Sequence, residues 1–349
     1  QYYTEHRYGP VRELAETSRG GPTLALLRGG ALGLDSLLPP AVVLSVGGTG
    51  LATVRCLAKG PMKIYAAFFP GGRDGVEVRY SRRSTPIALD FSPEDDDALL
   101  RWLRGLSRSL GQRPVVFPTS DSTALFIARH GRALEGACRT WQNGHEALRA
   151  IICKDRLYRA AEAAGIRVPP MLVAPAPAET RAWCREHPPP YFVKPFYTAI
   201  GNCALTRKNR IFRSEAELLE YARSTSLRNI LVQRMIDCGD GRVHDAYGLC
   251  DARGEVLVLA SHGRIRQYPP DTGATSHGEI PIIGDPGLER EIFRCTRELL
   301  SRVPYHGIFG IEWLREKGTG ALYLTDFNAR PFSSIGHLAD CGLNLPLLA

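Results

Sequence analysis

The chain has 349 residues, of which 44% are hydrophobic and 23% charged; these ordinary proportions exclude a disordered or fibrous protein. No stretch approaches the roughly 20 uncharged apolar residues of a membrane helix, so no membrane role is expected. The net charge is +8, but the basic residues are interleaved with acidic ones and form no stripe, which is not the pattern of a nucleic-acid binder.

Residues 1–40 are punctuated by Gly and Pro, and we assign them no function. The first 17 residues are polar and carry both charge signs, so no signal peptide is expected. The nine cysteines include no CxxC spacing, which favours reduced thiols over a zinc site or a disulfide framework. These features predict a cytoplasmic protein. The missing initiator Met and the apolar end at Ala349 lead us to expect trimmed termini.

Strand and helix patterns alternate between residues 41 and 145. Helices are predicted over 51–57 and 94–110, the second begun by Ser92-Pro93, and short apolar strands over 41–46, 64–69 and 115–117. Because such alternation is typical of parallel sheets, we expect an open parallel α/β domain over 41–145.

A glycine-rich run follows the first predicted strand. Gly48-Thr49-Gly50-Leu51-Ala52-Thr53 comes close to GxGxxG, with Thr in the third glycine position; in that motif backbone amides approach an anion. The next strand, 63–70, contains no acidic residue to hold a ribose, which argues against a dinucleotide. Two interpretations stay open: a tight structural turn, or a loop in which Gly48 and Gly50 hold a substrate carboxylate.

From Lys154 onward the pattern indicates an antiparallel α+β domain, which we expect over 146–349. Turns at 251–254 and 317–320 join neighbouring strands as hairpins. Helices are predicted over 155–165 and 214–224, and strands over 168–173, 192–194, 230–235, 243–250, 255–262, 310–314 and 321–327.

Two of the six lysines lie at junctions between elements. Lys154 begins a helix, and Lys194 ends a strand before a loop that contains Gly201. Two fixed ammonium groups can offset the repulsion within a triphosphate, while loop amides contact other oxygens. For each lysine alone, a solvated side chain is the alternative.

Glu312, Asp326 and Asn328 lie on two strands joined by a hairpin. Residues 326 and 328 project from one face of an extended chain, and pairing through the turn can bring Glu312 to that face. Two carboxylates and an amide oxygen are hard ligands that suit Mg²⁺ completed by phosphate and water oxygens. Arg330 can stabilise negative charge on a transferring phosphoryl group. Taken alone, Asp326 could cap the end of a strand and Glu312 could form a surface ion pair. These structural roles do not explain why the three residues occur together.

In order and spacing, these segments resemble the ATP-grasp superfamily, and its carboxylate–amine ligase branch in particular, over about 41–349. The resemblance is carried by the first glycine loop, PTSD, KDRLYRAAEAAGIRVP, FVKP, LVQRMI, GIEWL and DFNARP. It implies a fold of α/β and α+β parts: an N-terminal parallel domain, an antiparallel ATP-grasp core and a lid over about 168–230.

The resemblance also assigns residues to ligands. Gln233 and Asp326 stand where the family more often has Glu. The carried-over set comprises Lys154, Lys194 and the Gly201 loop at the ATP phosphates, Gln233, Arg234, Met235 and Ile236 at the adenine, Glu312, Asp326 and Asn328 at Mg²⁺ or Mn²⁺, and Arg330 beside the reacting phosphate.

Three further residues are assigned to the substrates. Arg264 and Arg266 alternate on a strand that resembles the family's substrate region, and would bind the carboxylate or the acyl phosphate; two surface arginines are the alternative. Asp121 either holds the substrate's amino group or caps a helix over 123–130.

The implied activity is ATP-dependent ligation of a carboxylate, expected to be an amino acid or small peptide, to an amine. The reaction passes through an acyl phosphate and releases ADP and phosphate. A non-catalytic nucleotide-binding or regulatory protein is one alternative, and a ligase that uses a thiol or bicarbonate is another. Small molecules are the expected partners, no nucleic acid is expected, and a homodimer is a possible assembly.

Overall fold

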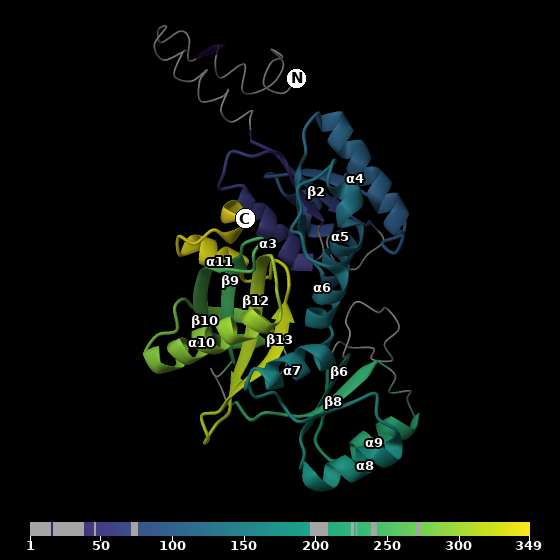
Figure 1. The fold of residues 1–349 in the computed structure, drawn as a ribbon, viewed down its shortest axis with the longest axis vertical. Helices are drawn as coiled ribbons and strands as arrows, with labels where there is room; N and C mark the ends of the chain where they lie inside the picture. The colour runs from purple at the N-terminus through teal and green to yellow at the C-terminus, as the bar shows by residue number, and fades with distance from the viewer. Residues whose placement is uncertain are drawn as a thin grey trace. The chain divides into compact units, whose positions relative to one another are not determined.

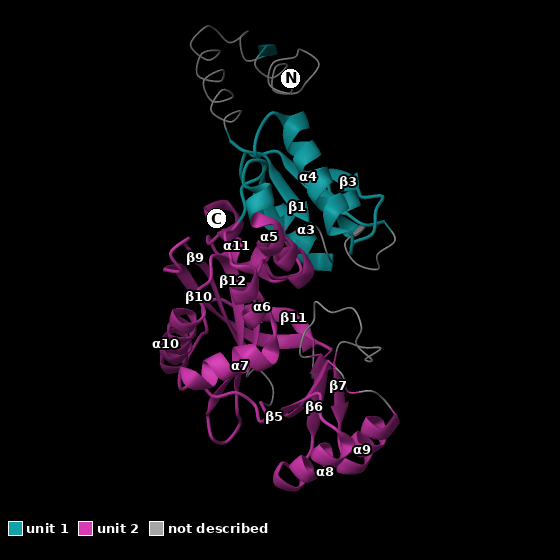
Figure 2. Cartoon of the chain, turned by 45° about the vertical axis from the view of Figure 1, so that its right-hand side comes forward, with its two compact units in different colours: residues 1–117, 132–140 teal, residues 118–131, 141–349 magenta. Residues whose placement is uncertain are grey.

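The computed structural model describes residues 15–16, 38–44, 47–70, 76–195, 209–224, 227, 229–238, 243–269 and 273–349. The chain divides into two compact units, coloured separately in Figure 2. Unit 1 comprises residues 1–117 and 132–140, and unit 2 comprises 118–131 and 141–349. The domain boundary at 145 stays a prediction. Within the described ranges, no helix has the length and apolar character needed to span a bilayer.

Unit 1 is built on a parallel sheet of strand order β3-β2-β1-β4. Its strands are β1 (Ala41–Leu44), β2 (Ile64–Phe68), β3 (Thr85–Ala88) and β4 (Val115–Pro118). All residues of β1 and β2 are buried, which explains why these strands are continuous apolar runs. The edge strand β3 was not predicted; it contains Pro86, which lacks the amide that a central strand needs.

Two helices of unit 1 begin at residues other than those predicted. Helix α3 (Gly47–Leu57) begins at the glycine run rather than at Leu51, and Gly47 makes the turn with a φ of 58°. Helix α4 (Asp96–Leu110) begins two residues late, because Asp95 supplies the cap by accepting a 2.8 Å hydrogen bond from the amide of Ala98. The 3₁₀ helix η1 (Val76–Tyr80) lies between β2 and β3.

Unit 2 contains a five-stranded antiparallel sheet of order β11-β10-β9-β12-β13. Strand β10 runs six residues beyond its predicted end at 262, and β11 was not predicted. The strands are β9 (Val243–Cys250), β10 (Val256–Tyr268), β11 (Ala274–Glu279), β12 (Gly307–Arg315) and β13 (Leu322–Asn328). The expected combination of parallel and antiparallel sheets is therefore confirmed.

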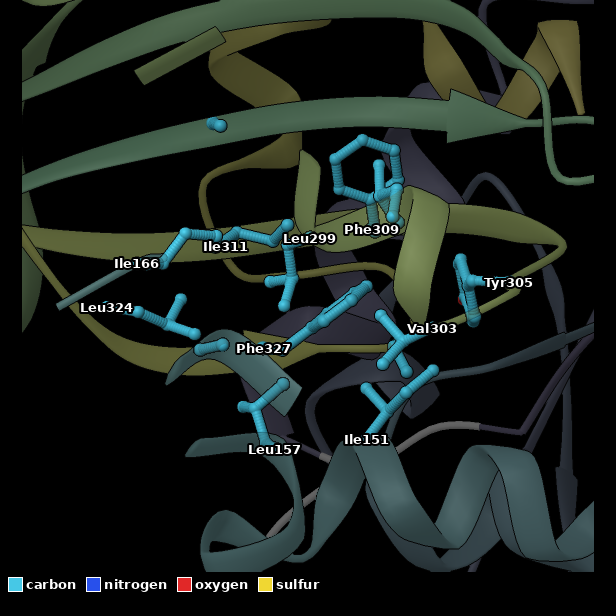
Figure 3. Close-up of a cluster of buried hydrophobic side chains, with 14 of the residues drawn as sticks. Ile151, Leu157, Ile166, Leu299, Val303, Tyr305, Phe309, Ile311, Leu324 and Phe327 are labelled. Carbon is cyan, nitrogen blue, oxygen red and sulfur yellow. The ribbon is translucent and has the colours of Figure 1, made fainter. Parts of the chain in front are cut away.

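One apolar core joins this sheet to helices α6 (His145–Ile152), α7 (Lys154–Ala163) and α10 (Pro286–Arg302). Figure 3 shows side chains of that core, with Ile151 and Leu157 from the helices facing Phe327 from the sheet. Because one face of the sheet is packed in this way, Asp245 of β9, Glu312 of β12 and Asp326 of β13 lie on the other face.

A smaller antiparallel sheet of order β5-β8-β6-β7 lies in the region expected to form a lid. Its own buried cluster includes Tyr191, Leu218 and Ile230, and Figure 1 shows helices α8 and α9 beside it. The elements are β5 (Met171–Val173), α8 (Pro177–Glu186), β6 (Tyr191–Pro195), β7 (Arg210–Phe212), α9 (Glu215–Ser224) and β8 (Ile230–Arg234). The remaining helices of unit 2 are α5 (Asp121–Leu134), whose last three residues belong to unit 1, α11 (Ile335–Asp340) and α12 (Leu345–Leu348).

Gly248→Ala is expected to lower the free energy of unfolding by about 1–3 kcal/mol. A Cβ at Gly248 would lie 2.4 Å from Phe309 Cζ and 2.4 Å from the carbonyl oxygen of Val258, so β9 would have to shift between its neighbours. Urea denaturation measures the change. Gly336→Ala in α11 is the control, because a Cβ there meets nothing within 4 Å. Equal stability of Gly248→Ala and the unsubstituted protein would contradict the packing described here.

Candidate active site

Four polar side chains form one row across the large sheet. The strand register pairs His262 of β10 with Asp245 of β9, Asp245 with Glu312 of β12, and Glu312 with Asp326 of β13. Side chains paired directly across antiparallel strands project to the same face. The structure thus brings Glu312 and Asp326 together. We call His262, Asp245, Glu312 and Asp326 the polar row.

A β-bulge at Thr325 decides which residues of β13 face the polar row. Register pairs Trp313 with Leu324 and Glu312 with Asp326, so Thr325 is the extra residue. Leu324 is buried in the core, but the bulge turns the following Asp326 to the opposite face. Asn328, two residues further along, shares that face and is half-buried.

Lys154 lies at the start of α7 and is 5% exposed. Its Nζ donates a 2.6 Å hydrogen bond to Oδ1 of Asp326, whose side chain is 34% exposed. Burial lowers the pKa of Lys154, but the carboxylates of Asp326, Asp121 and Glu312 outweigh it and raise the pKa overall. Lys154 is therefore a fixed cation beside an accessible carboxylate.

Lys194 comes from β6 of the smaller sheet and is 7% exposed. Its Nζ donates to the hydroxyl of Tyr158 at 3.2 Å and to the carbonyl of Thr325 at 3.3 Å. Tyr158 also donates to that carbonyl at 2.9 Å. Burial, together with the charges of Asp326 and Glu312, raises the pKa of Tyr158 well above 10. The two predicted phosphate-binding lysines thus converge on adjacent residues of β13.

Arg264 links two carboxylates of the polar row. Its Nε and Nη2 donate to Oδ2 and Oδ1 of Asp245 at 2.9 and 2.6 Å, and Nη2 also donates to Oε2 of Glu312. His262 Nδ1 lies 2.8 Å from Asp245 Oδ2. The other oxygen of Glu312, Oε1, accepts a 2.9 Å bond from the Thr325 hydroxyl. Protein carboxylates therefore hold Arg264 in place. It is neither a solvated surface arginine nor a side chain that is left free to bind a substrate.

Arg266 is exposed, unlike Arg264. The register with β11 shifts between these two residues, because Arg264 pairs with Gly278 and Arg266 with the adjacent His277. The bulge interrupts the alternation that led us to expect both arginines on one face.

Arg330 and Asp121 contact each other, although they were assigned separate roles. Arg330 Nε donates to Asp121 Oδ1 at 2.8 Å. Asp121 lies in the first turn of α5, while Ser120 Oγ accepts from the amide of Thr123 at 3.2 Å and caps that turn. Arg330 is thereby oriented by an acid from a distant part of the sequence.

The predicted adenine-binding segment lies at the end of β8. Gln233 is 3% exposed and pairs in register with Met171 and Phe192; its buried Oε1 has no hydrogen-bond partner among the residues that the structure describes. Arg234 pairs with Glu316 at 3.0 Å. Met235 donates its amide to the carbonyl of Pro190 at 3.0 Å, and Ile236 is buried. A buried orphan acceptor fits a ligand that donates a hydrogen bond.

Three predicted residues are not placed in this site. Gly48 and Gly50 belong to α3 of unit 1, and a Cβ at Gly48 would meet nothing within 4 Å. Gly201 lies outside the described residues. The roles of all three stay predictions.

The donor set fits a hard divalent cation. Glu312 and Asp326 are adjacent in register, their side chains are 26% and 34% exposed, and Asn328 adds an amide oxygen on the same face. Within the described ranges, no three His, Cys, Asp or Glu side chains cluster with metal-binding geometry. An ion would therefore depend on Asn328 and on ligands from outside the protein.

Sequence reasoning missed four polar groups here: Tyr158, Asp245, His262 and Thr325. Asp245 is the clearest case, because an acid within a strand of apolar residues is costly unless it is paired. That signal was present in the sequence of β9.

No protein-family model and no curated protein sequence matches the chain. Solved structures do match it. An ADP complex of N5-carboxyaminoimidazole ribonucleotide synthetase is 15% identical with a TM-score of 0.63, covering 87% of this chain and 74% of that one. An L-amino acid ligase from Bacillus licheniformis is 16% identical with a TM-score of 0.64, covering 89% and 73%. A biotin carboxylase from Campylobacter jejuni is 14% identical with a TM-score of 0.64, covering 90% and 70%. At these identities the likeness is one of fold.

Proposed function

We propose that this chain, which has the ATP-grasp fold of the matched enzymes, is an ATP-dependent ligase that joins a carboxylate to an amine. One observation carries the proposal: Lys154 and Lys194, from different elements, converge on Thr325 and Asp326 beside Glu312. Cations for a triphosphate and hard oxygens for a metal ion are thus present in one place. The fold expected from the sequence resemblance is confirmed.

In this proposal, Lys154 and Lys194 bind the phosphates of ATP and Gln233 accepts a hydrogen bond from the base. Glu312, Asp326 and Asn328 would hold Mg²⁺ or Mn²⁺, which neutralises charge on the transferring phosphoryl group when it is bound. Lys154, Lys194 and Gln233 are buried, and electrostatic stabilisation is stronger where water is excluded.

The proposed reaction has two steps. A carboxylate oxygen of the substrate attacks the γ-phosphorus of ATP, and the bond to the ADP oxygen breaks. The amine nitrogen then attacks the acyl carbon; the bond to phosphate breaks, and the nitrogen loses a proton. Arg330, oriented by Asp121, would stabilise the negative charge that develops on the phosphate. Arg266, which is exposed on β10, is the proposed contact of the carboxylate substrate, whereas Arg264 is bound to Asp245 and Glu312.

A screen of ADP release against acids crossed with amines tests this function. Amino acids and dipeptides are tried first, because one matched structure is an amino acid ligase. Bicarbonate and thiols form separate arms that test the alternative co-substrates. We expect ADP release that needs both an acid and an amine. Nucleotide binding without ADP release under any combination would favour the non-catalytic alternative. The cytoplasmic location and the homodimer stay predictions.

A further inference from the structure

Asp245 is the most buried acid of the polar row. Its side chain is 4% exposed, against 26% for Glu312 and 34% for Asp326. A charged carboxylate at such a depth is costly unless cations and hydrogen-bond donors surround it. The structure provides both, so Asp245 carries its charge inside the sheet next to a proposed metal ligand.

The partners of Asp245 leave it no role in direct contact with a ligand. Oδ2 accepts from Arg264 Nε and lies within hydrogen-bond distance of His262 Nδ1, while Oδ1 accepts from Arg264 Nη2. Burial would raise the pKa of Asp245, but the guanidinium of Arg264 and the hydrogen bond with His262 hold that pKa well below its usual range. The acid is ionised and acts through its neighbours.

Arg264 transmits the effect of Asp245 to Glu312. Exposure rises along the contact chain, from 4% at Asp245 to 12% at Arg264 and 26% at Glu312. The buried acid takes two hydrogen bonds from the guanidinium, whereas Glu312 takes one. Because a paired fork to a carboxylate fixes the plane and direction of an arginine, Asp245 sets how far Arg264 engages Glu312.

We propose that Asp245 is a positioning residue that limits Arg264 to a single hydrogen bond with Glu312 and so leaves the Glu312 carboxylate available to a divalent cation. The inference rests on the proposed function, in which Glu312 is a metal ligand. Without the charge of Asp245, the guanidinium would pair with Glu312 alone and compete with the metal ion. The alternative is an ion pair that only stabilises the sheet.

Binding of Mn²⁺ in the presence of a non-hydrolysable ATP analogue, measured by calorimetry, distinguishes the two. Asp245→Asn is expected to weaken Mn²⁺ binding by about 10–100-fold, the usual effect of losing a group that supports a ligand. Arg264→Gln should bind Mn²⁺ at least as tightly as the unsubstituted protein. The double variant should return to within about threefold of the unsubstituted protein, because the two charges cancel.

Asp285→Asn is the matched control, since Asp285 also pairs with an arginine, Arg315, but at the start of α10. Its Mn²⁺ affinity should not change. A double variant as weak as Asp245→Asn, or an Arg264→Gln variant that loses Mn²⁺ binding, would overturn the inference in favour of a structural role. If Asp245→Asn does not fold, the other two variants still decide the question. Failure of the unsubstituted protein to bind Mn²⁺ and nucleotide would instead contradict the proposed function.

Discussion

Glu312→Gln and Asn328→Ala are expected to lower the rate of ATP turnover by about 10²–10³-fold while the protein stays folded. Asn328→Ala removes one of the three proposed metal ligands, and Glu312→Gln replaces a charged carboxylate ligand with a neutral amide. Stability is retained because Arg264 keeps its paired hydrogen bonds to Asp245 when Glu312 is neutral, so no buried charge is left alone. Coupled ADP release at saturating Mg²⁺ and thermal unfolding measure the two effects.

Glu298→Gln is the control for these variants, because Glu298 pairs with Arg302 on the surface of α10. An exposed pair of this kind is worth little, and turnover should be unchanged. Full activity of either Glu312→Gln or Asn328→Ala would remove the metal assignment. Partial recovery of Glu312→Gln at high Mg²⁺ would support it, because a weakened site fills at higher ion concentration.

Hairpin pairing was predictable, but the face of each residue depended on a bulge. The turn at 317–320 and the spacing of Asp326 and Asn328 correctly placed both opposite the strand of Glu312. Simple alternation would also have put Leu324 on the polar face. Thr325 prevents this, and its position depends on the register with β12, which a single strand does not encode. A second bulge separated Arg264 from Arg266 for the same reason.

Long-range ion pairs were the part of the site that local patterns did not contain. Arg330 was assigned to phosphate and Asp121 to a cap or an amine, yet the two meet across 209 positions of sequence. Lys154 and Asp326 were assigned to different ligands and contact each other. Residue type gave the chemistry of each group, whereas the pairing arises from how α5 and α7 pack beside β13. Asp245 is different, because the cost of burying an acidic side chain within β9 could have been recognised from the sequence.

Lys194→Met is expected to lower activity strongly while leaving stability almost unchanged. Lys194 is 7% exposed and donates to the neutral oxygens of Tyr158 and Thr325. A Met of similar length removes the ammonium group while filling the space. We therefore expect ATP turnover to fall by about 10²–10³-fold while the unfolding temperature changes little.

Lys317→Met, in the exposed turn between β12 and β13, should change neither quantity. Nucleotide titration and thermal unfolding of the two variants give the comparison. A Lys194→Met protein that loses stability in parallel with activity would show that the lysine holds the smaller sheet against β13 rather than serving a ligand. Lost activity at undiminished stability would mean that the ammonium group serves a bound anion rather than the packing of the protein, as expected of a residue in a functional site.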